Sequence, residues 1–180
     1  DYGSGNAGMT NVLRTVGKGA AALTLLGDFS KGILSVLIMR LLMFLCCGIT
    51  DTSLLDYIVA LAALMGHLFP VFYGFKGGKG ILVSAGAMLI LNPWSLLICL
   101  AVFLLFACLT RYISAGSIAA GITYPFGVMF TTWLSFGYVH WAEAGLAALI
   151  GLVVILMHHA NIKRLLNGTE SKVSFKSKKP

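Results

Sequence analysis

Hydrophobic residues run along this chain in long blocks that short polar stretches interrupt. An α-helix rises about 1.5 Å per residue, so about 20 apolar residues cross a hydrocarbon core of about 30 Å. The pattern predicts six spans, at residues 20–47, 53–75, 79–91, 93–110, 113–133 and 141–157. We therefore expect an all-α fold, a polytopic integral membrane helix bundle.

Prolines and aromatic residues refine the predicted spans. Pro70 is expected to break the second span near its end, and Pro125 predicts a kink in the fifth. The third span is short, so we expect it to be tilted or set partly inside protein. Trp133, Tyr138 and Trp141 have the placement of an interfacial aromatic belt.

The composition supports the membrane class. The chain is 58% hydrophobic and 11% charged, whereas soluble domains carry about 25% charged residues. No Ser/Pro-rich or acidic linker divides the 180 residues, so we expect a single domain over residues 1–180. The cysteines lie in or beside apolar runs without metal-ligand spacing, which favours small hydrophobic side chains over disulfides or ligands. They are Cys46, Cys47, Cys99 and Cys108.

The distribution of charge predicts the orientation of the spans. The chain has 13 Lys and Arg against 6 Asp and Glu. If the spans alternate, 11 of the 13 basic residues face one side, and the other two, Lys31 and Arg40, lie within the first span. The opposite loops, 48–53, 92–93 and 134–140, contain no Lys or Arg. We expect the basic side, which includes the C-terminus, to be cytoplasmic, and we attribute the excess charge to orientation and anionic substrates rather than nucleic acid.

Motif one is GSGNAGMTNVLR, residues 3–14, within an expected cytoplasmic loop over residues 1–19. Its first six residues match GxGxxG, but no strand precedes them, which argues against a dinucleotide fold. The functional interpretation is a nest of backbone N–H groups with Arg14 as a cation and with four hydrogen-bonding side chains, Ser4, Asn6, Thr10 and Asn11. Such groups suit a phosphate or a polyol. A flexible loop without a ligand is the alternative.

Motif two is GHLFPVFYGFKGGKG, residues 66–80, between two apolar runs. Glycines let backbone N–H groups approach a ligand and lysines supply charge, so this stretch predicts an anion site. The groups that carry this expectation are Lys76, Gly77, Gly78 and Lys79. The stretch is not a Walker A loop, because a glycine follows Lys79. The lysines as simple topology signals are the alternative, and His67 taken alone fits a structural histidine.

Motif three is HHANIKRLLNGTE, residues 158–170. His158, Asn161 and Arg164 lie three residues apart, hence on one helical face, while His159 points elsewhere. A histidine and an asparagine that face the same site can orient a hydroxyl or an acyl carbonyl. The alternative is an amphipathic helix that rests on anionic headgroups.

Three ionisable residues lie inside the first span. Asp28 and Lys31 are one turn apart, and such groups are costly in a membrane unless they are paired or functional. Two alternatives stay open for them: a mutual salt bridge, or a role in bracing motif one. Arg40 lies nearer the far end of the span, where it snorkels or pairs internally, and it is given no catalytic role.

Carboxylates are scarce near the basic face, where the sequence places only Asp1, Asp28 and Glu170. The chain has no HxxxxD, HExxH or GxSxG motif. A cation-rich, carboxylate-poor site suits phosphorylated substrates and argues against a carboxylate-held metal or a Ser-His-Asp triad. We therefore expect no metal and no cofactor.

Together with RYISAGSI at residues 111–118, the three motifs resemble the bacterial acyl-phosphate:glycerol-3-phosphate acyltransferases, the PlsY family. The resemblance covers essentially the whole chain, in order. Each loop alone is unspecific, but the combination is highly specific. Family members have seven membrane helices and this chain shows six, so the first helix is expected to be missing.

The resemblance implies transfer of a fatty acyl group from acyl phosphate to the 1-hydroxyl of glycerol 3-phosphate, which gives lysophosphatidic acid and phosphate. It also implies a multi-pass protein of the bacterial inner membrane with a cytoplasmic active site, in contact with membrane lipids. Neither acyl-CoA nor acyl carrier protein is the direct donor, no metal is needed, and no obligate protein partner is inferred. Carried onto this chain, the family's site residues are Ser4, Asn6, Arg14, His67, Lys76, Lys79, Ser114, His158 and Asn161.

These residues divide into two predicted roles. The expected catalytic residues are Ser4, Lys76, Ser114, His158 and Asn161. The expected phosphate-binding residues are Asn6, Arg14, His67, Lys76, Gly77, Gly78 and Lys79. The amide of Asn161 can stabilise the developing oxyanion. The general base is either His158 or the donor's own phosphate, and the sequence leaves both open.

A transporter or channel for a phosphorylated solute is the rival from another class. It would need polar residues through the membrane midplane and two repeated halves. Beyond Arg40, the spans hold only Asp56 and Glu143 as charged residues, both near the uncharged loops, and no internal repeat is visible. A structural membrane subunit, the third reading, leaves the glycine and lysine loops unexplained.

Overall fold

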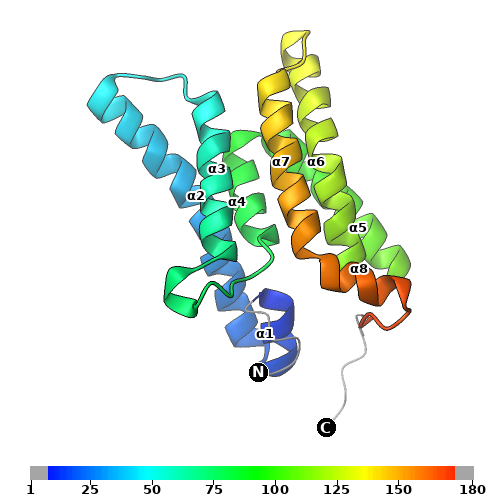
Figure 1. The fold of residues 1–180 in the computed structure, drawn as a ribbon. Coiled ribbons are helices and arrows are strands. Elements are labelled where there is room, and N and C mark those ends of the chain that lie inside the picture. Colours follow the sequence, from blue (N-terminus) through cyan, green and yellow to red (C-terminus); the bar gives the residue numbers. More distant parts are fainter. Residues whose placement is uncertain (1–7, 173–180) are drawn as a thin grey trace. The chain divides into compact units, whose positions relative to one another are not determined.

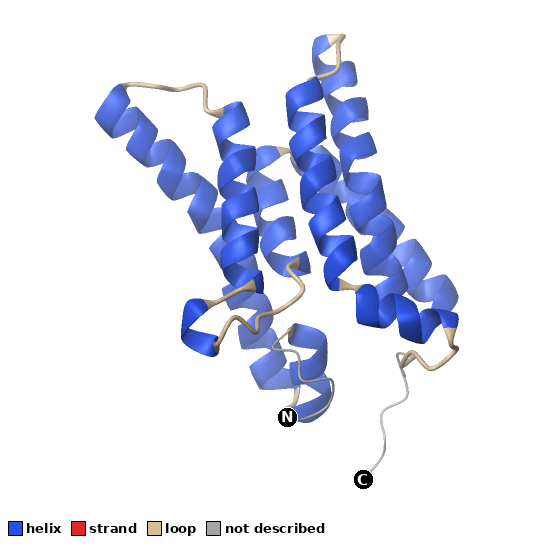
Figure 2. Ribbon diagram, in the orientation of Figure 1, coloured by secondary structure: helices blue, strands red, loops and turns tan. Residues whose placement is uncertain are grey.

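The computed structural model describes residues 8–172, and within that range the regular structure is helical, with no strand (Figure 2). This confirms the all-α expectation. The chain divides into two compact units, Asp1–Pro93 and Trp94–Pro180. The organisation as one domain stays a prediction, and each unit is described by itself.

The first unit is built around the long helix α2 (Figure 1). Its elements are α1 (Met9–Thr15), α2 (Lys18–Cys47), α3 (Ser53–Leu68), the 3-10 turn η1 (Val71–Tyr73) and α4 (Ile81–Leu91). Helix α2 packs against α4, α3 and α1. Two glycines let α2 and α4 meet backbone to backbone: a Cβ on Gly32 would overlap the carbonyl oxygen of Val83, and one on Gly86 would overlap that of Phe29. Such small-residue contacts are how membrane helices approach closely.

The second unit comprises α5 (Pro93–Thr110), α6 (Ile113–Phe136), α7 (Trp141–Met157) and α8 (His159–Leu166). Helices α6 and α7 pack along their length, again through glycine, since a Cβ on Gly151 would overlap the carbonyl oxygen of Gly121. Helices α5 and α6 share a buried hydrogen bond of 3.1 Å between the hydroxyls of Ser95 and Thr131. Polar side chains thus pair inside the unit while apolar ones face outward.

Six apolar helices, α2 to α7, correspond to the six predicted spans. Within the described residues, four of them are long and apolar enough to cross a membrane, or five if α7 and α8, which meet at 58°, form one span. Helix α4 has only 11 residues. The predicted count of six spans is therefore not confirmed, although the predicted limits of α5 and α7 match the structure.

The second span has the break that the sequence predicts at Pro70. Helix α3 ends at Leu68 and η1 begins at Val71, because Pro70 disfavours helical geometry in the residue before it. The two elements together form a candidate span over Ser53–Tyr73, close to the predicted 53–75. Residues 69–80, which we call the glycine-lysine loop, then lead to α4. Helix α6, by contrast, continues through Pro125, and the kink expected there stays a prediction.

Large apolar side chains cover the outside of both units. Leu23, Leu45 and Trp141 are among those that are exposed, whereas the buried core includes Tyr57 and Val128. In water so much exposed apolar surface would be unfavourable, but it suits contact with lipid. Trp133, Tyr138 and Trp141, the predicted aromatic belt, are all exposed.

Candidate active site

The glycine-lysine loop folds back onto the end of α3. The backbone N–H of Gly77 donates to the carbonyl of Leu68 at 3.0 Å, and that of Phe75 donates to Pro70 at 3.0 Å. A Cβ on Gly77 would overlap the carbonyl oxygen of His67, and one on Gly78 would overlap the His67 imidazole. These two glycines therefore allow the loop to lie directly against His67.

His67 is held from the other side by α2. Its Nδ1 lies 3.6 Å from Oδ1 of Asp28, and the same oxygen lies 3.1 Å from Nζ of Lys31. The predicted salt bridge between Asp28 and Lys31 is confirmed. The contacts of Asp28 also reach motif two through His67, a connection that the sequence analysis did not anticipate, and its bracing of motif one stays a prediction.

The cations of the first unit are near its surface. Lys76 and Arg14 are exposed, and Lys79 is half-buried. Because α2 and α3 run in opposite directions, α1 and the glycine-lysine loop lie at the same end of this unit (Figure 1). Arg14, Lys76 and Lys79 thus come from two stretches at one end of a single helical unit.

Part of motif one is a helix, and the expected loop over residues 1–19 is therefore wrong for that part. Met9–Thr15 forms α1, which packs on α2. After Gly8 the sequence has no helix-breaking residue, and Met9, Val12 and Leu13 give it a helical apolar face. Ser4 and Asn6 lie outside the described residues.

In the second unit, three side chains converge on the carboxylate of Glu170. Ser114 donates from Oγ to Oε1 at 2.8 Å, Asn161 donates from Nδ2 to Oε1 at 2.7 Å, and Arg164 donates from Nε to Oε2 at 2.6 Å. The Glu170 side chain is only 7% exposed. The predicted site residues Ser114 and Asn161, from different helices, are thus joined by one carboxylate.

The environment of Glu170 lowers its pKa. Burial acts in the opposite direction and would raise the pKa, but hydrogen bonds from Asn161, Arg164 and Ser114, with the charge of Arg164, outweigh it. Each of these donors favours the ionised carboxylate. Glu170 is therefore a charged acceptor that orients three donors.

His158 lies at the junction of α7 and α8 and is only 3% exposed. Its Nδ1 lies 2.8 Å from the carbonyl oxygen of Val154. A carbonyl can only accept, so Nδ1 carries the proton, and in the neutral imidazole Nε2 is then the nitrogen with a lone pair. His159, as expected, points elsewhere: it is exposed and its Nδ1 contacts Leu156.

Glu170 is a candidate site residue to which the sequence analysis assigns no role. The sequence shows it only as one of the few carboxylates near the basic face. Gly168 has φ +68°, and the N–H of Thr169 donates to the carbonyl of Arg164 at 2.8 Å, so the chain turns back after α8 and brings Glu170 to Asn161. The sequence signal for this contact is an acid, Glu170, that follows Gly168 in a basic stretch, since a glycine after a helix lets the chain turn back.

The structure therefore gathers the predicted residues into two groups. The first unit holds Arg14, His67, Lys76, Gly77, Gly78 and Lys79. The second unit holds Ser114, His158 and Asn161. Among the described residues, no group of three or more His, Cys, Asp or Glu side chains is placed to hold a metal ion.

A family model, sequence relatives and solved structures all indicate the same family. The family model described as glycerol-3-phosphate acyltransferase matches residues 1–168. The chain is 47% identical to the glycerol-3-phosphate acyltransferase of Clostridioides difficile, over 97% of this chain and 81% of that protein. It is 44% identical to that of Neisseria meningitidis serogroup C, over 96% and 82%.

Two solved structures share the fold. The crystal structure of PlsY, an integral membrane glycerol 3-phosphate acyltransferase, in its glycerol 3-phosphate form has a TM-score of 0.76 and 34% identity, over 96% of this chain and 80% of that chain. The lysophosphatidic acid form has a TM-score of 0.74 and 34% identity, over 95% and 81%.

Proposed function

Since the chain belongs to the glycerol-3-phosphate acyltransferase family, we propose that it transfers a fatty acyl group from acyl phosphate to the 1-hydroxyl of glycerol 3-phosphate. The products are lysophosphatidic acid and inorganic phosphate. Both substrates carry phosphate and the donor also carries an apolar tail. A membrane protein with cationic loops suits that combination.

The observation that carries the proposal is the cluster around Glu170. It joins Ser114 of α6 to Asn161 of α8, although 56 residues separate Ser114 from Glu170 along the chain. The buried His158 lies one helical turn before Asn161. A histidine, an amide and a hydroxyl held in this way match what acyl transfer to a hydroxyl requires.

In the proposed reaction, the 1-hydroxyl oxygen of glycerol 3-phosphate forms a bond with the acyl carbon, and the bond between that carbon and the phosphate oxygen breaks. The hydroxyl proton passes to Nε2 of His158 or to the donor's phosphate, and it leaves with inorganic phosphate. An amide N–H of Asn161 stabilises the negative charge on the acyl oxygen. Acyl phosphate is already activated, so the protein supplies mainly position and electrostatics.

In this proposal, side chains of the first unit bind the phosphate groups of the two substrates. Arg14, Lys76 and Lys79 offset the charge of the two phosphates, and Ser4 and Asn6 are further hydrogen-bonding groups of the proposed site. His67 packs directly against the glycine-lysine loop, because its imidazole leaves no room for a side chain at Gly78. Gly77 and Gly78 therefore have two proposed roles. They let the loop pack against His67, and they let a phosphate approach the backbone N–H groups.

The proposed location is the bacterial inner membrane, with both groups of site residues and the C-terminus on the cytoplasmic side. The support is the charge pattern: 11 of the 13 Lys and Arg residues fall on one side if the spans alternate. Glycerol 3-phosphate is water-soluble, so it would reach such a site from the cytoplasm while the acyl tail of the donor stays in lipid.

The test is lysophosphatidate release by the purified full chain, with a long-chain acyl phosphate or acyl-CoA as donor. We expect product from acyl phosphate only, and product from acyl-CoA alone would overturn the donor assignment. If Nε2 of His158 takes the hydroxyl proton, His158→Ala lowers kcat by at least about a hundredfold, whereas a smaller fall assigns that proton to the donor's phosphate. His159→Ala, a change of the exposed neighbour, is the matched control and should keep activity. Unchanged turnover in both His158→Ala and Lys76→Ala would refute the site.

A further inference from the structure

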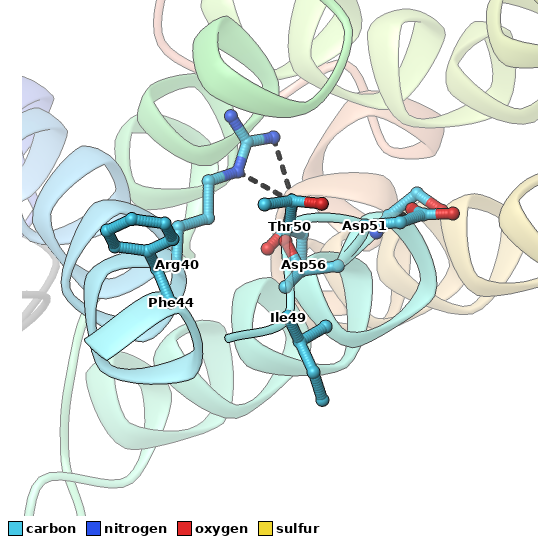
Figure 3. A pocket seen from close by; sticks show the side chains of 8 residues that line it. Arg40, Phe44, Ile49, Thr50, Asp51 and Asp56 are labelled. Atoms are coloured by element: carbon cyan, nitrogen blue, oxygen red, sulfur yellow. Dashed lines mark hydrogen bonds and ion pairs between the residues drawn. The ribbon is translucent and has the colours of Figure 1, made fainter. Parts of the chain in front are cut away.

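Arg40 and Lys172 are cations outside the proposed site, and side-chain contacts hold them in different ways. Arg40 lines a pocket where α2 ends and α3 begins, and its Nε and Nη2 each lie 2.8 Å from Oδ2 of Asp56 (Figure 3). This ion pair confirms the internal pairing that the sequence offered as one alternative for Arg40. Lys172 is exposed and contacts an aromatic ring instead, close to the cluster around Glu170.

The ammonium group of Lys172 lies over the ring of Tyr112. Its Nζ is 5.7 Å from the ring centroid, within the distance of about 6 Å at which the face of an aromatic ring attracts a cation. Tyr112 immediately precedes α6, and Lys172 follows α8. The contact therefore joins the segment after α8 to the start of α6.

Tyr112 is a fixed anchor for this contact. Its backbone N–H donates to Oγ1 of Thr110 at 3.1 Å, and that hydroxyl donates to the carbonyl of Phe106 at 2.6 Å. The Tyr112 hydroxyl makes no hydrogen bond with the described residues, so the ring is the part of this side chain that the fold uses. Ser114, a proposed catalytic residue, is only two positions further along the chain.

The segment after α8 is held by its backbone only as far as Thr169. The N–H groups of Asn167, Gly168 and Thr169 donate to carbonyls of α8 at 3.1, 3.2 and 2.8 Å. Over residues 170–172, no backbone hydrogen bond is made to any described residue. Side chains therefore decide where these three residues lie.

The hydrogen bonds of Glu170 do not by themselves secure its contact with Ser114. Two of its three donors, Asn161 and Arg164, belong to α8, from which the segment itself emerges. The contacts of the segment with the start of α6 are the bond from Ser114 and the position of Lys172 over Tyr112. Without the second contact, Glu170 can remain bonded to α8 while the Ser114 hydroxyl turns away.

We propose that Tyr112 and Lys172 are positioning residues, which keep Glu170 bonded to Ser114 and so orient the Ser114 hydroxyl for acyl transfer. This inference rests on the proposed function. A cation and a ring face attract each other without the tyrosine hydroxyl, so the effect requires the charge and the ring alone. Because the first unit binds the phosphates in the proposed function, loss of the contact changes kcat rather than the KM for glycerol 3-phosphate.

The experiment measures lysophosphatidate release by purified full-chain variants in detergent, with thermal unfolding as the check that each is folded. Lys172→Met removes the charge but keeps an apolar stem, and Tyr112→Leu removes the ring. We expect each change to lower kcat about two- to fivefold, the size of an exposed cation–π interaction, with an unchanged KM for glycerol 3-phosphate. Lys163→Met removes another exposed cation, on α8, and is the matched control that should keep the wild-type kcat.

Conservative variants separate positioning from a general loss of structure. Tyr112→Phe keeps the ring and Lys172→Arg keeps the charge, so both should retain the wild-type kcat. In a Ser114→Ala background, Lys172→Met should have no further effect, since a residue that acts through Ser114 cannot act without it.

Three results would overturn the inference. They are a wild-type kcat in Lys172→Met, a fall in Tyr112→Phe equal to that in Tyr112→Leu, and additive effects of Lys172→Met and Ser114→Ala. Absence of lysophosphatidate from the wild type itself is a different outcome, because it would refute the proposed function and the inference with it.

Discussion

The two units organise their predicted site residues in different physical ways. In the second unit, Glu170 accepts three hydrogen bonds of 2.6–2.8 Å, so charge orders the side chains. In the first unit, Asp28 lies 3.6 Å from His67, beyond a good hydrogen bond, and the loop is shaped by Gly77 and Gly78 packed against His67. The second unit should therefore respond to the loss of a charge, and the first to the addition of volume.

Removal of the Glu170 carboxylate should have the largest effect. In Glu170→Ala, the side chains of Ser114, Asn161 and Arg164 lose a common acceptor. Because unsatisfied buried polar groups cost about 1–3 kcal/mol each, we expect a loss of at least about 2 kcal/mol in stability and about a hundredfold in kcat/KM. Thermal unfolding in detergent and product release measure the two effects. Thr169→Ala is the neighbouring control, and an E170A protein with wild-type activity would show that the cluster does not order the site.

Extra volume in the glycine-lysine loop should have the next largest effect. In Gly78→Ala, the new methyl overlaps the His67 imidazole, so the loop must move. We expect about a tenfold or greater rise in the KM for glycerol 3-phosphate, since misplacement by about 1 Å is costly. Gly66→Ala is the matched control, because a Cβ there meets nothing within 4 Å. If both variants behave alike, the packing of the loop on His67 has no functional role.

A change of charge in the first unit should matter less. Asp28→Asn keeps the shape of the side chain while it removes the charge that faces Lys31 and His67. Lys31 is 62% exposed although the Asp28 side chain is only 10% exposed, and the exposed partner weakens the contribution of this ion pair. We therefore expect no more than about a fivefold fall in kcat/KM, far less than for Glu170→Ala. A loss as large as that of Glu170→Ala would erase the contrast between the units.

Acid should destabilise the second unit through Glu170, by the smallest of these effects. The folded-state pKa lies below the ordinary value of 4.5, so the contribution of the ionised cluster is complete above that value. It is lost as the pH falls through the lower folded-state pKa. Unfolding curves between about pH 7 and pH 3 should show a loss of stability for the wild type that is reduced in Glu170→Gln. Parallel curves for the two proteins would contradict the assignment.

Local patterns were enough to predict most of the helices. Apolar runs and the Asn92–Pro93 turn predict the limits of α4 and α5 to within two residues, because hydropathy and proline act on adjacent positions. The count of six spans is not confirmed, because within the described residues α4 is short and α7 reaches the length of a span only together with the bent α8.

The contacts of the site were less accessible from sequence. Ser114 and Glu170 are 56 residues apart, and no periodic pattern links a hydroxyl in one helix to an acid after another. The same holds for Asp28 and His67, which two different helices bring together. Spacing did reveal that Asn161 and Arg164 share a helical face, and both donate to Glu170.

The close approach of α2 and α4, in which Gly32 faces Val83 and Gly86 faces Phe29, has a consequence for biogenesis. Helix α4, with 11 residues, extends about 16 Å, roughly half of the hydrocarbon thickness. Hydropathy alone is then a weak signal for its insertion by the translocon. Helix α2 precedes α4 in the chain, so during synthesis the helix on which α4 packs is available before α4 itself.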